Sequence, residues 1–135
     1  MSDVDSPNLV DLDRFAVAVE RVEKPWGHET IYTLADAPYC GKILFVRAGE
    51  ELSLRFHRRK DETVFVQDGR VELEIGEPGR TPDIEVVGPG RAFHLAPGTV
   101  HRIRAMEDAH VLEVSTAGRE DVVLLENRYG PRSVD

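Results

Sequence analysis

The sequence predicts an all-β sandwich or barrel in one domain, because short alternating segments are separated by closely spaced turn signals. Polar and apolar residues alternate over 51–57, 70–75 and 103–105, which is the period of a strand with one buried face. Roughly nine or ten such short strands, with almost no helical periodicity, are typical of this class. A chain of 135 residues has room for one domain and little more.

Short apolar runs rich in β-branched residues supply the other strand signals. These runs are Ile43 to Val46, Thr63 to Val66, Val111 to Val114 and Val122 to Leu125. Glycine and proline mark turns between the runs, at 48–50, 67–69, 76–79, 88–90 and 97–98. A weak helical pattern covers 9–19, where a strand fits equally well. We expect a flexible acidic N-terminal tail over 1–14 and the β-barrel domain over 15–135.

The composition is that of a soluble protein. Asp and Glu total 25 against 17 Lys and Arg, a formal charge of −8, which argues against non-specific binding of nucleic acid. Cys40 is the only cysteine, so no intrachain disulfide can form, and this suits a reducing compartment. No stretch approaches the roughly 18 apolar residues of a membrane helix. We therefore expect a cytoplasmic protein with no nucleic-acid or membrane partner.

Three residues are spaced as metal ligands. His57 and Glu62 flank a four-residue polar turn, so a hairpin would bring them together. His101 follows a Pro-Gly turn that can return a strand end to the same pocket. Two imidazoles and one carboxylate can hold a divalent transition metal facially and leave positions open for substrate or water. The sequence therefore predicts a metal centre at these three residues.

The same residues resemble the two cupin motifs. Gly49, Arg55-Phe56-His57, Glu62 and Gly69 resemble the first motif, a glycine, a His-x-His pair, a glutamate and a closing glycine. The segment 97–101 resembles the second motif, a Pro/Gly turn that leads to the last metal-binding histidine. The resemblance implies a jelly-roll barrel with one metal inside, held by His57, Glu62 and His101. The metal would be Zn, Mn, Fe or Ni. Arg55 stands where the first histidine of His-x-His would be.

A narrower resemblance is to the cupin domain of type II mannose-6-phosphate isomerases. It runs from about residue 22 to 132, and the segments that carry it are 24–29, 52–57, 97–102 and 121–130. It implies a metal-dependent aldose–ketose isomerase that acts on a sugar or sugar phosphate. Lys60 and Arg102 fall where those enzymes carry arginines, so both are candidates to bind phosphate or to assist proton transfer. The alternatives without a role in function are a solvated loop charge for Lys60 and a surface salt bridge for Arg102.

Arg55 and Glu113 each have two interpretations. Arg55 cannot ligate a metal, because its guanidinium has no lone pair to offer, but it could grip a phosphate or carboxylate. Alternatively it forms an internal ion pair with Glu62 or Glu113. Glu113 interrupts an apolar run and could be the base that moves a proton between C1 and C2 of a sugar. Alternatively it pairs with Lys42, itself a candidate for binding substrate.

His94 lies within a short apolar segment and could point into the pocket to bind substrate or replace the missing ligand. Alternatively it forms a hydrogen bond at the barrel rim.

Two other functions and one assembly state stay open. A two-His-one-Glu site also suits an Fe(II)-dependent dioxygenase. Arg55 in a ligand position favours a non-catalytic barrel that binds a sugar or a small acid. Leu52, Leu54 and Phe56 would form an apolar outer face if alternation holds, and edge strands are available for pairing. We therefore expect a homodimer.

Overall fold

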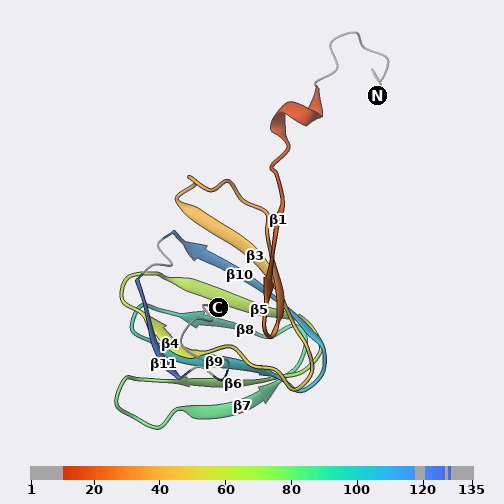
Figure 1. The fold of residues 1–135 in the computed structure, drawn as a ribbon. Coiled ribbons are helices and arrows are strands. Elements are labelled where there is room, and N and C mark those ends of the chain that lie inside the picture. Colours follow the sequence, from red (N-terminus) through yellow and green to blue (C-terminus); the bar gives the residue numbers. More distant parts are fainter. Residues whose placement is uncertain (1–10, 118–120, 127, 129–135) are drawn as a thin grey trace.

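The computed structural model describes residues 11–117, 121–126 and 128, which form two antiparallel sheets and one 3-10 helix (Figure 1). The elements in chain order are η1 (Leu12–Phe15), β1 (Glu20–Lys24), β2 (Gly27–Ile31), β3 (Tyr39–Val46), β4 (Leu54–His57), β5 (Glu62–Asp68), β6 (Val71–Gly76), β7 (Asp83–Val87), β8 (Ala92–Leu95), β9 (Val100–Ala105), β10 (Ala109–Thr116) and β11 (Val122–Glu126). One sheet has the order β1-β2-β3-β10-β5-β8 and the other β11-β4-β9-β6-β7. This is the single-domain, all-β jelly-roll arrangement that the sequence predicts.

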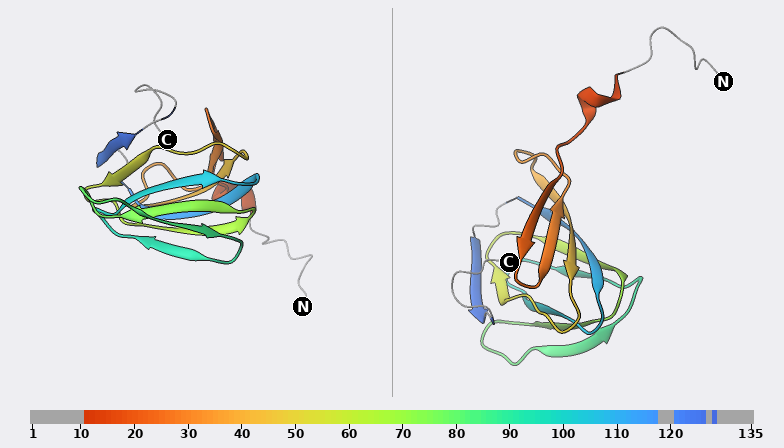
Figure 2. Two further views of the ribbon diagram at one scale, coloured as in Figure 1. Left: turned by 90° about the horizontal axis from the view of Figure 1, so that it is seen from below. Right: turned by 45° about the vertical axis from the view of Figure 1, so that its right-hand side comes forward.

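The two sheets face each other around an interior that is apolar at one end (Figure 2). The largest side chain there is Trp26, which is fully buried in the turn between β1 and β2. The other core residues are Leu44, Val46, Leu52, Val64, Val66, Val71, Leu73, Val87, Leu95, Ile103, Ala105, Ala109 and Val111. These apolar side chains supply the hydrophobic stabilisation of the barrel.

The opposite end of the interior is charged, and β10 shows the change most clearly. Its buried side chains, in chain order, are Ala109, Val111, Glu113 and Ser115. Because alternate residues of a strand face the same side, all four point inward. Glu113 lies opposite Lys42 of β3, and Ser115 lies opposite Glu62 of β5. Buried polar residues are therefore concentrated at the end of β10, next to the start of β3 and the start of β5.

The alternation predicted for 51–57 holds only from residue 54 onward. Arg55 and His57 of β4 are buried, whereas Leu54 and Phe56 are half-buried on the outer face. Leu52 belongs to the hydrophobic core, so the expected apolar outer face is smaller than the sequence indicates. β4 is also covered at its edge by β11. The homodimer stays a prediction.

The N-terminal expectations fall partly outside the described residues, because residues 1–10 are not described. Within 9–19, Leu12–Phe15 form a 3-10 helix that buries no residue. The chain is extended at Ala16, and β1 begins at Glu20. Among the residues that the structure describes, no helix is long and apolar enough to span a membrane.

Each predicted turn contains a glycine, and one of these glycines is packed tightly. Gly69, between β5 and β6, has a φ of +82°, in the left-handed region that L side chains rarely adopt. A Cβ there would lie 2.4 Å from the carbonyl oxygen of Asp108. Gly79 has the same φ, but a Cβ there would meet nothing within 4 Å. A comparison of substitutions at Gly69 and Gly79 therefore distinguishes the cost of backbone strain, which both share, from the cost of a steric clash, which arises only at Gly69.

We expect Gly69→Ala to destabilise the fold more than Gly79→Ala. Both substitutions incur the left-handed penalty of about 1–2 kcal/mol. Gly69→Ala must also displace backbone, at a further cost of about 1–3 kcal/mol. Urea unfolding of the two variants measures the difference directly. Equal losses of stability would show that the contact with Asp108 is relieved without cost.

Candidate metal centre

The three predicted metal ligands lie together at the charged end of the interior. His57 ends β4, Glu62 begins β5 and His101 is the second residue of β9. Glu62 Oε2 lies 3.4 Å from His57 Nε2 and 3.5 Å from His101 Nε2. All three side chains are at least nine-tenths buried. The residues that the sequence assigns to one pocket are therefore in contact, while their role as metal ligands stays a prediction.

Each histidine is oriented by an acceptor on its other ring nitrogen. His57 Nδ1 lies 3.0 Å from Asp121 Oδ1, and His101 Nδ1 lies 3.0 Å from the carbonyl oxygen of Thr99. A carboxylate and a carbonyl accept hydrogen bonds, so each Nδ1 carries the hydrogen. Each Nε2 then presents a lone pair toward Glu62. Partners of this kind fix the tautomer and the ring orientation of metal-binding histidines.

The pKa values of these groups favour neutral imidazoles. Burial lowers the pKa of His101 to about 4, and burial together with the charge of Lys60 lowers the pKa of His57. Burial and the neighbouring Glu113 raise the pKa of Glu62 to about 7. Near neutral pH, two uncharged imidazoles thus surround a carboxyl group that readily exchanges a proton for another cation.

The chemistry of this donor set fits a divalent transition metal. Ligand atoms at right angles, on bonds of about 2.1 Å, lie about 3 Å apart, so the observed separations are slightly wide. In the positions that the structure gives them, no three or more His, Cys, Asp or Glu side chains among the described residues could hold an ion. Binding would require small side-chain movements. Metal binding would give Glu62 Oε2 a partner, because this oxygen is buried without a hydrogen-bond partner among the residues described.

Three cationic and three carboxylate side chains share this interior, each less than a tenth exposed: Lys42, Arg55, Lys60, Glu29, Glu62 and Glu113. When all six are ionised their charges cancel. When the Asp121 carboxylate beside His57 is also counted, a divalent cation would leave one uncompensated positive charge. An interior of that charge attracts an anionic ligand.

The structure pairs Lys42 with another carboxylate than the expected Glu113, and it buries Lys60, which is 5 % exposed and therefore not a solvated loop charge. Lys42 lies opposite Glu113 in the sheet, but its ammonium is 3.5 Å from Glu29 Oε2 on β2. Lys60 Nζ lies 3.2 Å from Glu113 Oε2. Burial alone would raise the pKa of Glu113, but Lys42 and Lys60 outweigh it and hold that pKa below its ordinary value. Glu113 is therefore ionised next to the candidate centre.

Arg55 faces the same interior and lies opposite His101 in the pairing of β4 with β9. Its side chain is 7 % exposed. Its charge acts on the pKa of Glu62, His101 and Glu113. Arg55 thus contributes positive potential at the point where a fourth ligand would stand.

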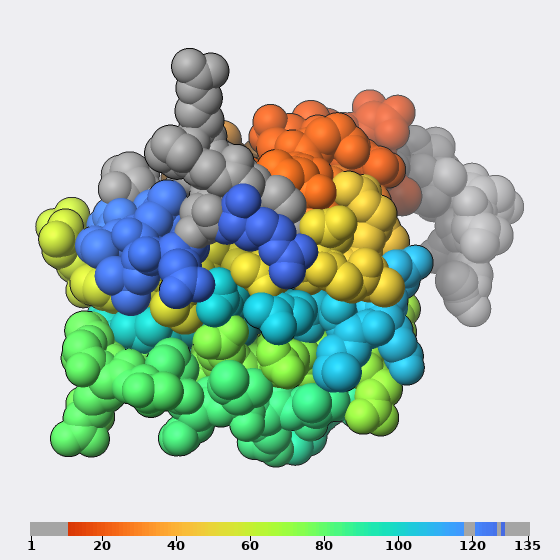
Figure 3. All heavy atoms as spheres, turned by 60° about the horizontal axis from the view of Figure 1, so that its bottom comes forward, coloured from red at the N-terminus to blue at the C-terminus, as the bar shows by residue number. Residues whose placement is uncertain are grey.

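The structure places Arg102 on the outer face of its sheet, away from the interior. Its guanidinium donates to Glu74 at 2.8 Å and to Glu126 of β11 at 2.9 Å, and it lies 3.2 Å from Glu51. The atoms of β11 lie against those of β4 and β9 in the space-filling view (Figure 3). Arg102 therefore fits the salt-bridge interpretation and does not reach the candidate metal centre.

His94 is also outside the interior. Its side chain is 63 % exposed, and its Nε2 lies 2.6 Å from Asp61 Oδ1. The neighbouring Leu95 is the residue of β8 that is buried in the core. The structure therefore supports the rim hydrogen bond rather than a role for His94 as a replacement ligand.

Comparison with known families matches residues 43–115, more than half of the chain, to the cupin domain. The chain belongs to the cupin family. The match includes His57, Glu62 and His101, so the candidate centre of this cupin lies within the part that defines the family. The search of curated proteins finds no significant match.

Many solved structures resemble this cupin. Oxalate decarboxylase from Bacillus subtilis matches with a TM-score of 0.69 and 19 % identity over 79 % of this chain and 30 % of its own. KdgF from Halomonas sp. matches with a TM-score of 0.63 and 24 % identity over 77 % of this chain and 91 % of its own. The capsular polysaccharide assembling protein CapF from Staphylococcus aureus has a TM-score of 0.69 and 13 % identity, over 87 % and 35 % of the two chains. At these identities the likeness shows the fold alone.

Asp121 is a functional candidate that the sequence did not single out. It lies 64 residues from His57, and its second carboxylate oxygen accepts hydrogen bonds from the backbone of Arg59 and Lys60. It therefore positions both the histidine and the loop that leads to Glu62. Its sequence signals are an acidic residue directly before an apolar run, which also describes many surface positions, and its place at the start of 121–130, one of the segments that resemble the isomerases.

We expect Asp121→Asn to weaken metal binding by this cupin about 10- to 100-fold, as is typical when a group that orients a histidine ligand is replaced. The amide keeps the shape of the carboxylate but stabilises the His57 tautomer less well. Competition with a fluorescent zinc chelator measures the affinity. Asp108→Asn, which alters an exposed carboxylate that accepts from Ala48, is the matched control. Equal affinities for both variants would rule out this role.

Metal binding is expected to weaken as the pH falls below about 7. In the metal-free protein the raised pKa of Glu62 lets it hold a proton there, and the incoming ion must displace it. One displaced proton corresponds to about a tenfold loss of apparent affinity per pH unit. Calorimetric titration with Zn²⁺ in two buffers of different ionisation enthalpy counts the released protons. A constant affinity between about pH 8 and about pH 6, one unit either side of the Glu62 pKa of about 7, would contradict the assignment.

Proposed function

We propose that this cupin is a metal-dependent aldose–ketose isomerase that acts on a sugar or sugar phosphate. The observation that carries the proposal is the buried Glu113 carboxylate, which lies 3.2 Å from the Lys60 ammonium and shares the charged interior with His57, Glu62 and His101. A divalent metal bound by those three residues would polarise the carbonyl and hydroxyl oxygens of the substrate. The protein's own residues would then have to move one proton between two adjacent carbons.

Glu113 is the candidate for that proton transfer. Its carboxylate would accept the proton from C2 of an aldose and return it to C1, through an enediol. In the free protein the charges of Lys42 and Lys60 make Glu113 a weak base. An anionic substrate that contacts these lysines would reduce their effect on Glu113 and raise its pKa toward a useful range. Substrate binding would thus activate the base.

Arg55 would orient the substrate rather than react with it. A guanidinium stays protonated and presents several donors in one plane, a geometry suited to a phosphate or carboxylate group. Its position opposite His101 would bring a bound anion close to the candidate centre. Arg102, on the outer face, has no part in this proposal.

Deuterium exchange tests the proposal. Protein loaded with Mn²⁺ or Zn²⁺ is incubated in D₂O with mannose 6-phosphate, fructose 6-phosphate or free pentoses, and exchange at C2 is followed by proton NMR. The proposal expects exchange with at least one sugar and its loss when the metal is removed with a chelator. Fully loaded protein that exchanges none of them would exclude this class of reaction.

A non-catalytic binding barrel is the second candidate, and the charge balance of the interior favours it. Three buried cations already offset most of the buried carboxylate charge without a metal. Such a barrel would bind a sugar or small acid through Arg55 and show thermal stabilisation by that ligand, without turnover. The oxygenase alternative shares the same donor set and gains no separate support from the structure.

A further inference from the structure

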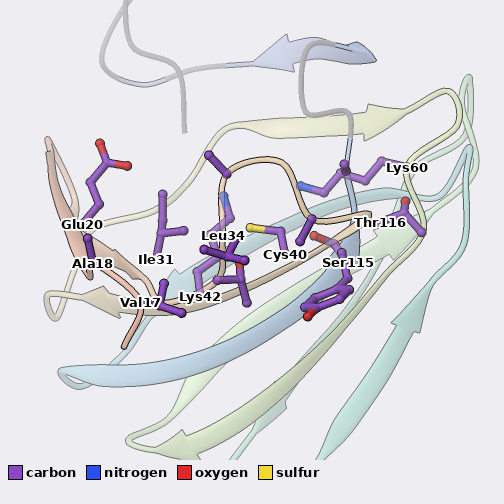
Figure 4. Close-up of a pocket in the computed structure, with 15 residues that line it drawn as sticks. Val17, Ala18, Glu20, Ile31, Leu34, Cys40, Lys42, Lys60, Ser115 and Thr116 are labelled. Atoms are coloured by element: carbon purple, nitrogen blue, oxygen red, sulfur yellow. The ribbon is translucent and has the colours of Figure 1, made fainter. Parts of the chain in front are cut away.

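A cavity of about 550 Å³ lies beside the candidate metal centre. Its walls come from the segment before β1, the turn between β2 and β3, the start of β3 and the end of β10, together with Lys60. Lys42 and Lys60 reach it from different elements in the close-up view (Figure 4). The three candidate ligands do not line it, but Ser115 of its wall lies opposite Glu62 in the sheet. The cavity therefore adjoins the centre without containing it.

One buried polar group in this wall has no partner. Ser115 is 7 % exposed, and its Oγ forms no hydrogen bond with any described part of the chain. A buried hydroxyl without a partner is costly, which is why such groups are rare in folded proteins. Because Ser115 lines a cavity large enough for a small molecule, a bound ligand can supply the missing partner.

Lys42 and Lys60 supply further donors to the same cavity. Both are 5 % exposed, and each ammonium has three N–H donors. The contacts of Lys42 Nζ with Glu29 and of Lys60 Nζ with Glu113 are 3.5 Å and 3.2 Å long. Each ammonium thus keeps donors beyond its carboxylate partner. Buried ammonium groups with spare donors favour an anionic ligand.

Carboxylates lie beside these lysines and in the cavity wall. Glu29 and Glu113 contact the two lysines, and Glu20 of β1 lies in the wall. Lys42 and Lys60 are therefore balanced in the metal-free protein. A divalent ion at the adjoining centre would leave positive charge uncompensated, so the cavity should bind an anion more tightly when the metal is present.

Apart from Thr33 and Thr116, the rest of the wall is largely apolar. Val17, Ile31, Leu34 and Tyr39 line the cavity together with four alanines. This surface can pack against carbon atoms but cannot pair with charge. We infer that the cavity binds a substrate that carries one phosphate or carboxylate group on a carbon skeleton, with the anion held by Lys42, Lys60 and Ser115. The inference rests on the proposed function only in assigning the reacting end of that substrate to the adjoining centre.

Calorimetric titration with phenyl phosphate tests the inference. This probe combines a phosphate with an apolar ring and has no carbon that could be isomerised, so its binding does not depend on the proposed reaction. The titration uses chelator-treated protein and protein loaded with Zn²⁺. Inorganic phosphate, benzoate and phenol are the comparison probes, because they separate the contributions of the phosphate, the charge and the ring.

The expected result is binding of phenyl phosphate to chelator-treated protein, tighter with Zn²⁺, and no binding of phenol. Lys60→Met should weaken binding about 10- to 100-fold through loss of a charge-assisted hydrogen bond, and Ser115→Ala about 3- to 10-fold. Lys24→Met, at the far end of β1, removes an equal charge and should change nothing. Ser115→Ala removes a hydroxyl without a partner, so the fold should tolerate it.

Three results would overturn the inference. The first is no binding of phenyl phosphate in either form of the protein. The second is binding only with Zn²⁺ and equal in wild type and Ser115→Ala, which would place the phosphate on the metal. The third is equal loss in Lys24→Met and Lys60→Met. Deuterium exchange with sugars can fail independently of all three, so the failure of the isomerase proposal is distinguishable.

Discussion

Replacing Glu113 by Gln is expected to lower the rate of sugar isomerisation by about 100- to 10,000-fold, the usual contribution of a positioned acid–base group. Glutamine has nearly the same size but cannot accept a proton from C2. The centre formed by His57, Glu62 and His101 is otherwise unchanged, so the metal should be retained. The measurement is kcat together with the rate of deuterium exchange at C2, at equal metal content.

A control separates this effect from the loss of an internal charge. Glu74→Gln removes a buried carboxylate on the outer face, where it pairs with Arg102, and should change stability without changing turnover per folded molecule. If Glu113→Gln retained the wild-type kcat with metal bound, Glu113 would not be the base. Its contact with Lys60 would then be structural.

Replacing His101 by Ala is expected to weaken metal binding by more than about 100-fold, because loss of a ligand should cost more than loss of a group that only orients one. Two ligands would remain, His57 and Glu62, and the vacated space would admit water. The affinity for Zn²⁺ or Mn²⁺ is measured by competition with a chelator. Circular dichroism and thermal unfolding confirm that the variant is folded.

His110→Ala is the matched control for the loss of an imidazole. His110 lies on the outer face of β10, where its ring nitrogen contacts Asp68 and its ring packs near Phe45. Its removal should leave metal affinity within about twofold of wild type, as expected for a surface substitution far from the centre. Equal losses in both variants would indicate non-specific binding of metal by surface histidines.

The candidate ligands could be located from the sequence because each depends on local structure. A short loop joins His57 to Glu62, but β4 and β5 belong to different sheets, so the loop crosses between the sheets and the predicted hairpin is wrong. The loop still holds the two strand ends close together, and a Pro-Gly turn precedes His101. The strand signals at 43–46, 63–66 and 111–114 are confirmed by β3, β5 and β10 for the same reason. Local sequence patterns are sufficient to locate a residue where the next strand begins within a few residues of it.

Two other residues that were candidates for the site, Arg102 and His94, point away from the interior. The alternation of side chains along a strand could have predicted this from the sequence. Arg102 directly follows His101 in β9, so its side chain points to the opposite face. His94 likewise precedes the buried Leu95. Applying the two-residue period consistently would have placed both outside the interior.

Long-range partners could not be predicted in this way. Asp121 contacts His57 across 64 residues, and Glu29 pairs with Lys42 of the neighbouring strand β3 across 13 residues. Neither pairing leaves a periodic signal in the sequence, because the contact depends on how the sheets are assembled. The same holds for Ser115, whose position in the cavity wall follows from the register of β10 with β3 and β5.

Metal stoichiometry tests the central claim most directly. Protein purified without chelator, and the same protein dialysed against Mn²⁺, Fe²⁺, Zn²⁺ or Ni²⁺, is assayed by elemental analysis beside Glu62→Gln. The predicted result is one ion per chain in the wild type and none in the variant, with both proteins folded. A folded wild-type protein that takes up none of the four metals, or a Glu62→Gln variant that binds as much as wild type, would contradict a metal centre at His57, Glu62 and His101.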